Sequence, residues 1–116
     1  VYKTNNLSHP GSYYKLFRRL LVHNELFPQT AYVLVGFTGY KGRTLYPLLA
    51  QRYIENAESA ELADIEKYMR SLGFLKVDDW TYQNTDIIIS DLKPKNVLKD
   101  SDGDLYVIDA EIKSVY

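Results

Sequence analysis

The chain has 116 residues, 46% of them hydrophobic, which is enough for one domain with a hydrophobic core but short for a large two-lobed enzyme. Its 14 basic and 15 acidic residues give a net charge of -1, so bulk electrostatics favour neither nucleic acid nor an anionic membrane as a partner. The absence of cysteine excludes disulfides and thiolate metal sites. We find no signal peptide and no apolar run of transmembrane length, and expect a cytoplasmic protein.

The first part of the chain is predicted to contain a short strand and a helix. Residues 1–4 are strand-like and are followed by a polar turn. Apolar residues recur at helical spacing over 12–26, where Ser12 can cap the helix and Pro28 ends it. We expect His23 to cap the C-terminus of this helix rather than to bind a metal.

Two strands are predicted next. The continuous apolar run 31–37 indicates a buried strand, and 44–54 forms the returning strand, in which Pro47 indicates an edge or a bulge. The glycine-rich segment 37–42 between them fits neither common phosphate-binding glycine motif and does not precede a helix. We therefore predict a hairpin turn there.

A second helix and an irregular strand follow. Residues 55–59 lead into a helix that ends before Gly73 and carries four apolar residues on one face, Leu62, Ile65, Met69 and Leu72. Residues 75–82 are interpreted as an irregular strand around Trp80, which we expect in the core. A turn over 84–86 precedes the next apolar run.

The most informative stretch is 86–111. Asp91 follows an apolar run, Asn96 comes five residues later, and Asp109 comes thirteen residues after Asn96, at the end of a second apolar run. The dipeptide Asp102-Gly103 between strand-like runs is a strong hairpin signal. That hairpin is predicted to bring Asn96 and Asp109 together.

These residue types suit phosphoryl transfer from a nucleotide. The reaction needs a group that orients the attacking hydroxyl and oxygen ligands that hold Mg²⁺ against the phosphates. Amide and carboxylate oxygens are suitable magnesium ligands, which assigns Asn96 and Asp109 to the metal and leaves Asp91 as the base. Lys93 would neutralise the transferred phosphoryl group.

The spacing resembles the catalytic loop and metal-binding Asp of the protein-kinase superfamily. Two features of that pattern differ, because Ile89-Ser90 replaces His-Arg and Asp109-Ala110-Glu111 replaces Asp-Phe-Gly. The first removes the usual partner of an activation-loop phosphate, and the second removes a packing switch. The same spacing occurs in small-molecule kinases of the aminoglycoside-phosphotransferase type, so this stretch leaves a protein and a small molecule open as phosphoacceptors.

With its flanks, the chain resembles the Ser/Thr/Tyr kinase-like domain of bacterial polyvalent proteins, which are large products of phage and conjugative elements. The stretches outside the core that carry this resemblance are 1–5, 24–28, 51–54 and 72–74. It implies a partial protein-kinase-like α+β fold, with an antiparallel small-lobe sheet and helix followed by a helix and the catalytic-loop hairpin. Residues 1–116 would form one domain, a fragment that lacks the glycine-rich loop and also lacks most of the large lobe. Further domains of a larger chain would flank it.

The resemblance also implies a nucleotide site that uses ATP and Mg²⁺. Lys3 would contact the nucleotide phosphates, and the connector containing Gln51 and Tyr53 would bind the adenine through its backbone. The usual helix Glu that pairs with the strand lysine has no clear counterpart, because the only acidic residue of the first helix is Glu25 in its last turn. We do not expect an ion pair between Lys3 and Glu25.

Three alternatives remain beside an active kinase. One is a degenerate kinase-like module that binds nucleotide or a partner without transfer, which the missing Glu, Arg, Phe and Gly favour. Another is a polar turn without function. The third is a calcium loop, because Asp100, Asp102, Asp104 and Glu111 occupy EF-hand ligand positions, but Leu105 stands where that loop needs Gly. We interpret the calcium-loop match as accidental.

Overall fold

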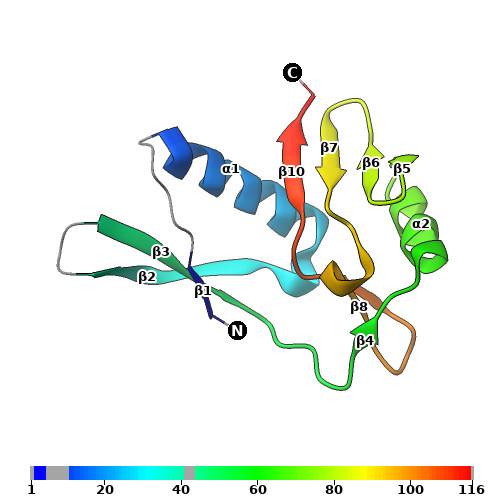
Figure 1. Ribbon diagram of the computed structural model, residues 1–116, viewed down its shortest axis with the longest axis horizontal. Helices are drawn as coiled ribbons and strands as arrows, with labels where there is room; N and C mark the ends of the chain where they lie inside the picture. Colours follow the sequence, from blue (N-terminus) through cyan, green and yellow to red (C-terminus); the bar gives the residue numbers. More distant parts are fainter. Residues whose placement is uncertain (1, 5–10, 41–43, 116) are drawn as a thin grey trace. The chain divides into compact units, whose positions relative to one another are not determined.

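The structure is a computed structural model that describes residues 2–4, 11–40 and 44–115 of an α+β chain (Figure 1). It contains two compact units, Val1–Tyr53 and Ile54–Tyr116. The assignment of the chain to one domain stays a prediction. Neither helix in the described residues combines the length and the apolar character that crossing a membrane requires.

The first unit is a three-stranded antiparallel sheet with one helix (Figure 1). Its elements are β1 (Tyr2–Thr4), α1 (Gly11–Leu26), a 3₁₀ turn at Pro28–Thr30, β2 (Tyr32–Tyr40) and β3 (Thr44–Gln51). The strand order is β1-β3-β2, so β3 is central. Because α1 begins at Gly11, Ser12 lies within the helix rather than capping it.

The helix packs on this sheet through one apolar stripe. Leu16 and Leu20, one turn apart on α1, are buried with Leu49 of β3, and Phe17 and Tyr32 pack against this cluster. Residues four apart lie on the same helix face, so the apolar spacing in the sequence predicts this stripe. Leu21, which shares the apolar spacing, is 69% exposed.

The C-terminal end of α1 is joined to the next strand by side-chain hydrogen bonds. Asn24 donates to the carbonyl of Tyr32 at 2.9 Å and accepts from its N–H at 2.7 Å. His23 is buried and its Nε2 lies 3.0 Å from the carbonyl oxygen of Thr30, in the 3₁₀ turn. The ring of His23 thus bonds the segment after the helix, and its role as a helix cap stays a prediction.

Strand β2 is not buried as predicted. Val33, Val35 and Phe37 are more than half exposed, at 59%, 52% and 51%. β2 is an edge strand of the sheet, and its pairing with β3 shifts between Leu34 and Gly36. An edge strand has a neighbour on one side only, so an apolar run there is not enclosed.

The returning strand is shorter than predicted and lies in the centre of the sheet. It ends at Gln51 rather than at residue 54. The described pairing of β1 with β3 ends at Thr4 opposite Leu48, so Pro47 lies beyond it and faces β2 alone among the described strands. A proline, which lacks an N–H, is tolerated at such a position.

The second unit contains one helix and two antiparallel sheets, with strand orders β10-β7-β6-β5 and β4-β8-β9. The elements, in chain order, are β4 (Glu58–Ser59), α2 (Leu62–Ser71), β5 (Leu75–Asp78), β6 (Thr81–Gln83), β7 (Ile87–Ser90), a 3₁₀ turn at Pro94–Asn96, β8 (Val97–Lys99), β9 (Leu105–Val107) and β10 (Glu111–Ser114).

The core of the second unit forms beneath α2. Ile65 and Met69, one turn apart, are 1% and 0% exposed. Burying each such side chain contributes about 1.5–3 kcal/mol. The predicted helix is thus confirmed, and Gly73, with φ of +90°, follows its end as the glycine signal predicted.

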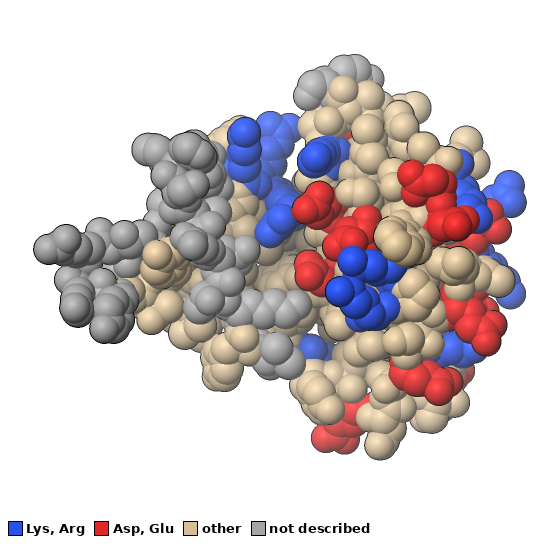
Figure 2. Space-filling view, viewed as in Figure 1, with Lys and Arg blue, Asp and Glu red and all other residues tan. Residues whose placement is uncertain are grey.

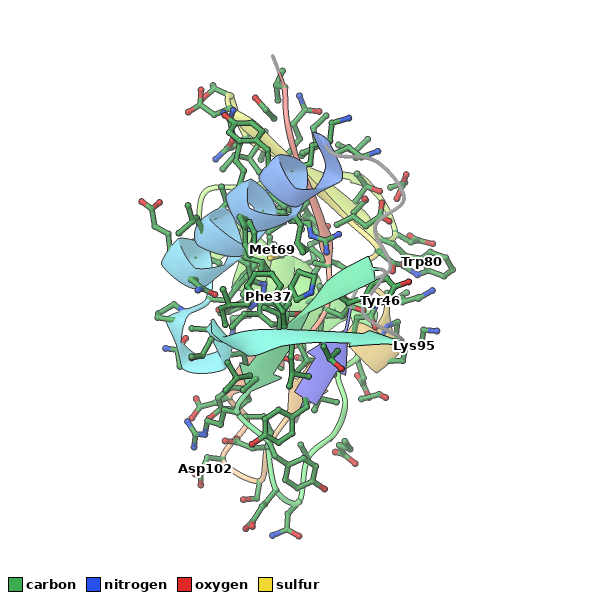
Figure 3. The ribbon with its side chains drawn as sticks, turned by 90° about the vertical axis from the view of Figure 1, so that its left-hand side faces the viewer. Phe37, Tyr46, Met69, Trp80, Lys95 and Asp102 are labelled. Carbon is green, nitrogen blue, oxygen red and sulfur yellow. The ribbon has the colours of Figure 1, made fainter. Side chains whose placement is uncertain are left out.

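The prediction that Trp80 lies in the core is wrong. Residues 75–83 form a hairpin of β5 and β6, and Trp80 lies in its turn with 48% of its surface exposed (Figure 3). The Asp78 carboxylate accepts a hydrogen bond from the backbone N–H of Trp80 at 3.0 Å, which shapes the reversal.

Candidate functional site

The loop between β7 and β8 is fixed by its backbone. Asp91 directly follows β7 and has a φ of +62°, a left-handed conformation that aspartate tolerates better than most residues other than glycine. Leu92 is fully buried and its N–H donates to the carbonyl of Trp80 at 3.0 Å. The N–H of Asn96 donates to the carbonyl of Lys93 at 2.8 Å and closes the 3₁₀ turn.

Three predicted site residues meet in this loop. Lys93 Nζ lies 3.1 Å from Asp91 Oδ1. Asn96 Nδ2 donates to the carbonyl of Asp91 at 2.8 Å and to its Oδ2 at 3.2 Å. Asn96 is buried, whereas the side chains of Asp91 and Lys93 remain 40% and 27% exposed. The carboxylate is therefore oriented by its neighbours and still open to solvent.

The amide of Asn96 keeps one ligand atom for a further partner. Its nitrogen makes both contacts with Asp91, and its Oδ1 accepts no hydrogen bond from any residue in the described parts of the chain. A carbonyl-type oxygen beside a carboxylate is a suitable ligand for a hard cation.

The predicted hairpin delivers Asp109 to this loop. β8 and β9 pair in register, with Val97 opposite Val107, and the N–H of Ile108 donates to the carbonyl of Asn96 at 3.0 Å. The turn has a residue in the left-handed conformation at Gly103, with φ of +85°, as a short hairpin loop requires. This confirms the predicted hairpin, in which Asp109 directly follows Ile108, the backbone partner of Asn96.

A second ladder fixes the chain on the other side of Asp109. Glu111, the first residue of β10, pairs with Ser90, the last residue of β7. Asp109 therefore stands between the two ladders, two residues after Val107 of one and two residues before Glu111 of the other. Its side chain is exposed and, among the described residues, makes no hydrogen bond or ion pair.

The site residues predicted in the first unit lie on its sheet or just after it. Lys3 lies in β1 opposite Leu49. Gln51 ends β3, is 5% exposed and donates from Nε2 to the carbonyl of Thr30 at 2.9 Å, while Tyr53 follows the strand and is 68% exposed. The side chain of Gln51 thus stabilises the fold. The nucleotide contacts assigned to these three residues stay predictions.

The acidic hairpin tip is a local structure. Ligand oxygens of Asp100, Asp102 and Asp104 lie within 4.8 Å of one another. The carboxylate of Asp100 accepts hydrogen bonds from the N–H groups of Asp102 and Asp104 and from the hydroxyl of Tyr106. Partial burial acts to raise the pKa of Asp100, but these hydrogen bonds together lower the pKa below its ordinary value. Strands rather than helices flank the tip, unlike in an EF-hand.

Three contributors to the site were not identified from the sequence. Trp80 holds the loop through its carbonyl and lies against Lys93, Ile108 bonds Asn96, and Ser90 pairs with Glu111. Only Trp80 could have been identified from the sequence, because it is the single tryptophan of the chain and lies near a predicted turn. The other two act through their backbones, which sequence patterns do not reveal. On the face shown in Figure 2, acidic and basic side chains are interleaved.

Comparison with known proteins identifies one family. The sequence model of a family described as Ser/Thr/Tyr kinase found in polyvalent proteins matches residues 1–115. No curated protein and no solved structure matches the chain. Because the match covers nearly the whole length, the chain belongs to the family of Ser/Thr/Tyr kinases found in polyvalent proteins.

Proposed function

We propose that this chain carries an ATP- and Mg²⁺-dependent phosphotransferase site of a partial protein-kinase-like fold, in which Asp91 is the base and Asn96 and Asp109 hold the metal. The observation that carries the proposal is the arrangement of Asn96. Its nitrogen is fixed by Asp91, its oxygen is left for a ligand, and its carbonyl bonds the residue before Asp109.

Each side chain then has one chemical task. Asn96 and Asp109 would hold Mg²⁺, and the ion would supply positive charge that offsets the negative charge of the transferred phosphoryl group. Asp91 accepts the proton of the attacking hydroxyl, since its carboxylate is accessible and oriented. Lys93 moves from Asp91 toward the phosphoryl group and stabilises its charge. Lys3 and the backbone of the segment from Gln51 to Tyr53 contact the nucleotide.

The tripeptide Asp109-Ala110-Glu111 favours a site that lacks the packing switch of the usual Asp-Phe-Gly. Ala110 is buried and Glu111 begins β10, which pairs with β7 over four residue pairs. A segment held in a sheet cannot change its packing without breaking several backbone hydrogen bonds. Asp109 is therefore expected to keep one position whether or not nucleotide is bound.

Calorimetric titration of ATP with and without Mg²⁺ tests the proposal. The unaltered chain should bind ATP more tightly with Mg²⁺, and Asp109→Asn should lose most of this Mg²⁺-dependent gain, because one charged ligand is removed. Asp102→Asn is the matched control, since it removes an exposed carboxylate from the tip of the same hairpin. Equal loss in both variants would contradict the assignment of Asp109 to the metal.

Failure of the unaltered chain to bind MgATP would favour the second candidate, a degenerate module. The observation in its favour is Ser90, which stands where the kinase pattern has Arg. The phosphoacceptor, a protein or a small molecule, and the bacterial mobile-element setting are proposals that rest on the sequence resemblance.

A further inference from the structure

The turn between β5 and β6 lies against the loop that carries Asp91 and Lys93. The carbonyl of Trp80 accepts a hydrogen bond from the N–H of Leu92 at 3.0 Å. Leu92 is fully buried, so this hydrogen bond joins the turn to a residue of the loop that is completely shielded from solvent.

The side chain of Trp80 makes a second contact with the same loop. Lys93 Nζ lies 5.6 Å from the centroid of the indole. A lysine ammonium within about 6 Å of an aromatic face is attracted by the negative charge density of the ring, and tryptophan is the strongest partner for such a contact. The same ammonium lies 3.1 Å from Asp91 Oδ1. Lys93 is thus held between a ring and a carboxylate.

We infer that Trp80 is a positioning residue of the site, which orients Lys93 for the phosphoryl group of a bound nucleoside triphosphate. The inference rests on the proposed function and extends it to a residue outside the loop. A long lysine side chain loses rotamer entropy when it is ordered, so a partner that restricts it in advance lowers that cost at the moment of binding.

The chemistry of the indole suits this task better than a second carboxylate would. An aromatic ring attracts the ammonium without forming a directed ion pair, so Lys93 can turn toward a phosphate while it remains over the ring. Trp80 is 48% exposed, which leaves room for that movement. Another carboxylate would compete with the phosphate for the same charge and would repel the phosphate itself.

A comparison of ATP with ADP distinguishes positioning from general support of the fold. ADP lacks the phosphoryl group that Lys93 is assigned to, so a positioning defect should weaken MgATP binding selectively. Trp80→Leu, in the full 116-residue chain, should lower the affinity for MgATP about two- to fivefold and leave MgADP unchanged. Trp80→Phe, which keeps an aromatic face, should recover most of the loss. Leu75→Ala, at a 65% exposed position of the same hairpin, is the control and should change neither affinity.

The single tryptophan offers a readout that does not depend on activity. Lys93→Met should change the fluorescence intensity of Trp80 because it removes the charge beside the ring, whereas Lys95→Met, at an exposed position in the same loop, should not. Equal emission in the two lysine variants would contradict the contact.

The outcomes separate this inference from the function on which it rests. Binding of MgATP by the unaltered chain, with equal losses for ATP and ADP in Trp80→Leu or with no loss at all, would overturn the inference alone. Absence of MgATP binding by the unaltered chain would overturn the proposed function and the inference together.

Discussion

Asp91 combines a left-handed backbone conformation with a proposed role as the base, and two substitutions separate the effects of these two properties. Asp91→Ala removes the carboxylate and places a residue without a polar side chain at a φ of +62°. Asp91→Asn also removes the charge, but asparagine adopts the left-handed conformation readily and keeps an oxygen that can accept from Asn96. Both variants lack the proposed base, so both should be inactive.

Their stabilities should differ. In Asp91→Ala the left-handed conformation costs about 1 kcal/mol, and loss of the hydrogen bond from Asn96 Nδ2 to Oδ2 costs about another 1 kcal/mol. Both variants lose the ion pair with Lys93, which at this exposure is worth about 0.5 kcal/mol. We therefore expect Asp91→Asn to cost roughly 0.5 kcal/mol and Asp91→Ala roughly 2.5 kcal/mol.

Urea unfolding followed by the fluorescence of Trp80 measures this difference, because the only tryptophan of the chain reports on the second unit. With a slope of about 1 kcal/mol per M for a unit of this size, the two midpoints should lie about 2 M apart. Asp91→Gly should unfold at a midpoint above that of Asp91→Ala, since glycine accepts the positive φ without steric cost. Coinciding midpoints for Asp91→Asn and Asp91→Ala would refute the reasoning.

Two further predictions concern the hairpin that delivers Asp109. Asp100 has a lowered pKa in the folded protein, so its contribution to stability is complete above the ordinary carboxyl pKa of 3.8 and is lost as the pH falls through the lower folded value. Asp100→Asn should therefore flatten the fall in unfolding free energy between pH 6 and pH 2, and an unchanged fall would contradict this. Gly103→Ala should cost about 1 kcal/mol through its φ of +85° alone, because no atom lies within 4 Å of the added Cβ. Gly103→Asn should cost less in the same urea assay, and a neutral alanine variant would count against backbone strain.

The parts of the fold that the sequence predicts correctly are those encoded by local signals. The hairpin follows from Asp102-Gly103 between two apolar runs, and α2 follows from its apolar spacing and Gly73. The meeting of Asp91, Lys93 and Asn96 follows from their closeness in one loop. In each case a few neighbouring residues determine the geometry, so a pattern is sufficient evidence.

The errors arise where tertiary position decides. The apolar run 31–37 does form a strand, but hydrophobicity does not reveal that this strand lies at the edge of its sheet. The prediction for Trp80 fails because large aromatic residues usually lie in the core, whereas the turn around this one depends on a hydrogen bond to Asp78. The left-handed conformation of Asp91 has no glycine to signal it.

The positions of Asn96 and Asp109 depend on the β8–β9 ladder and not on the number of residues between them along the chain. The ladder begins at Val97 opposite Val107, and the turn from Asp100 to Asp104 lies at its far end. Residues inserted into that turn would leave the pairing, and hence the two proposed metal ligands, in place, at an entropic cost that grows only slowly with loop length. The proposed site therefore requires a particular pairing register of β8 and β9, but no particular number of residues between Asn96 and Asp109. A related enzyme with a longer turn could carry the same site and still escape a search for Asn and Asp at a fixed separation.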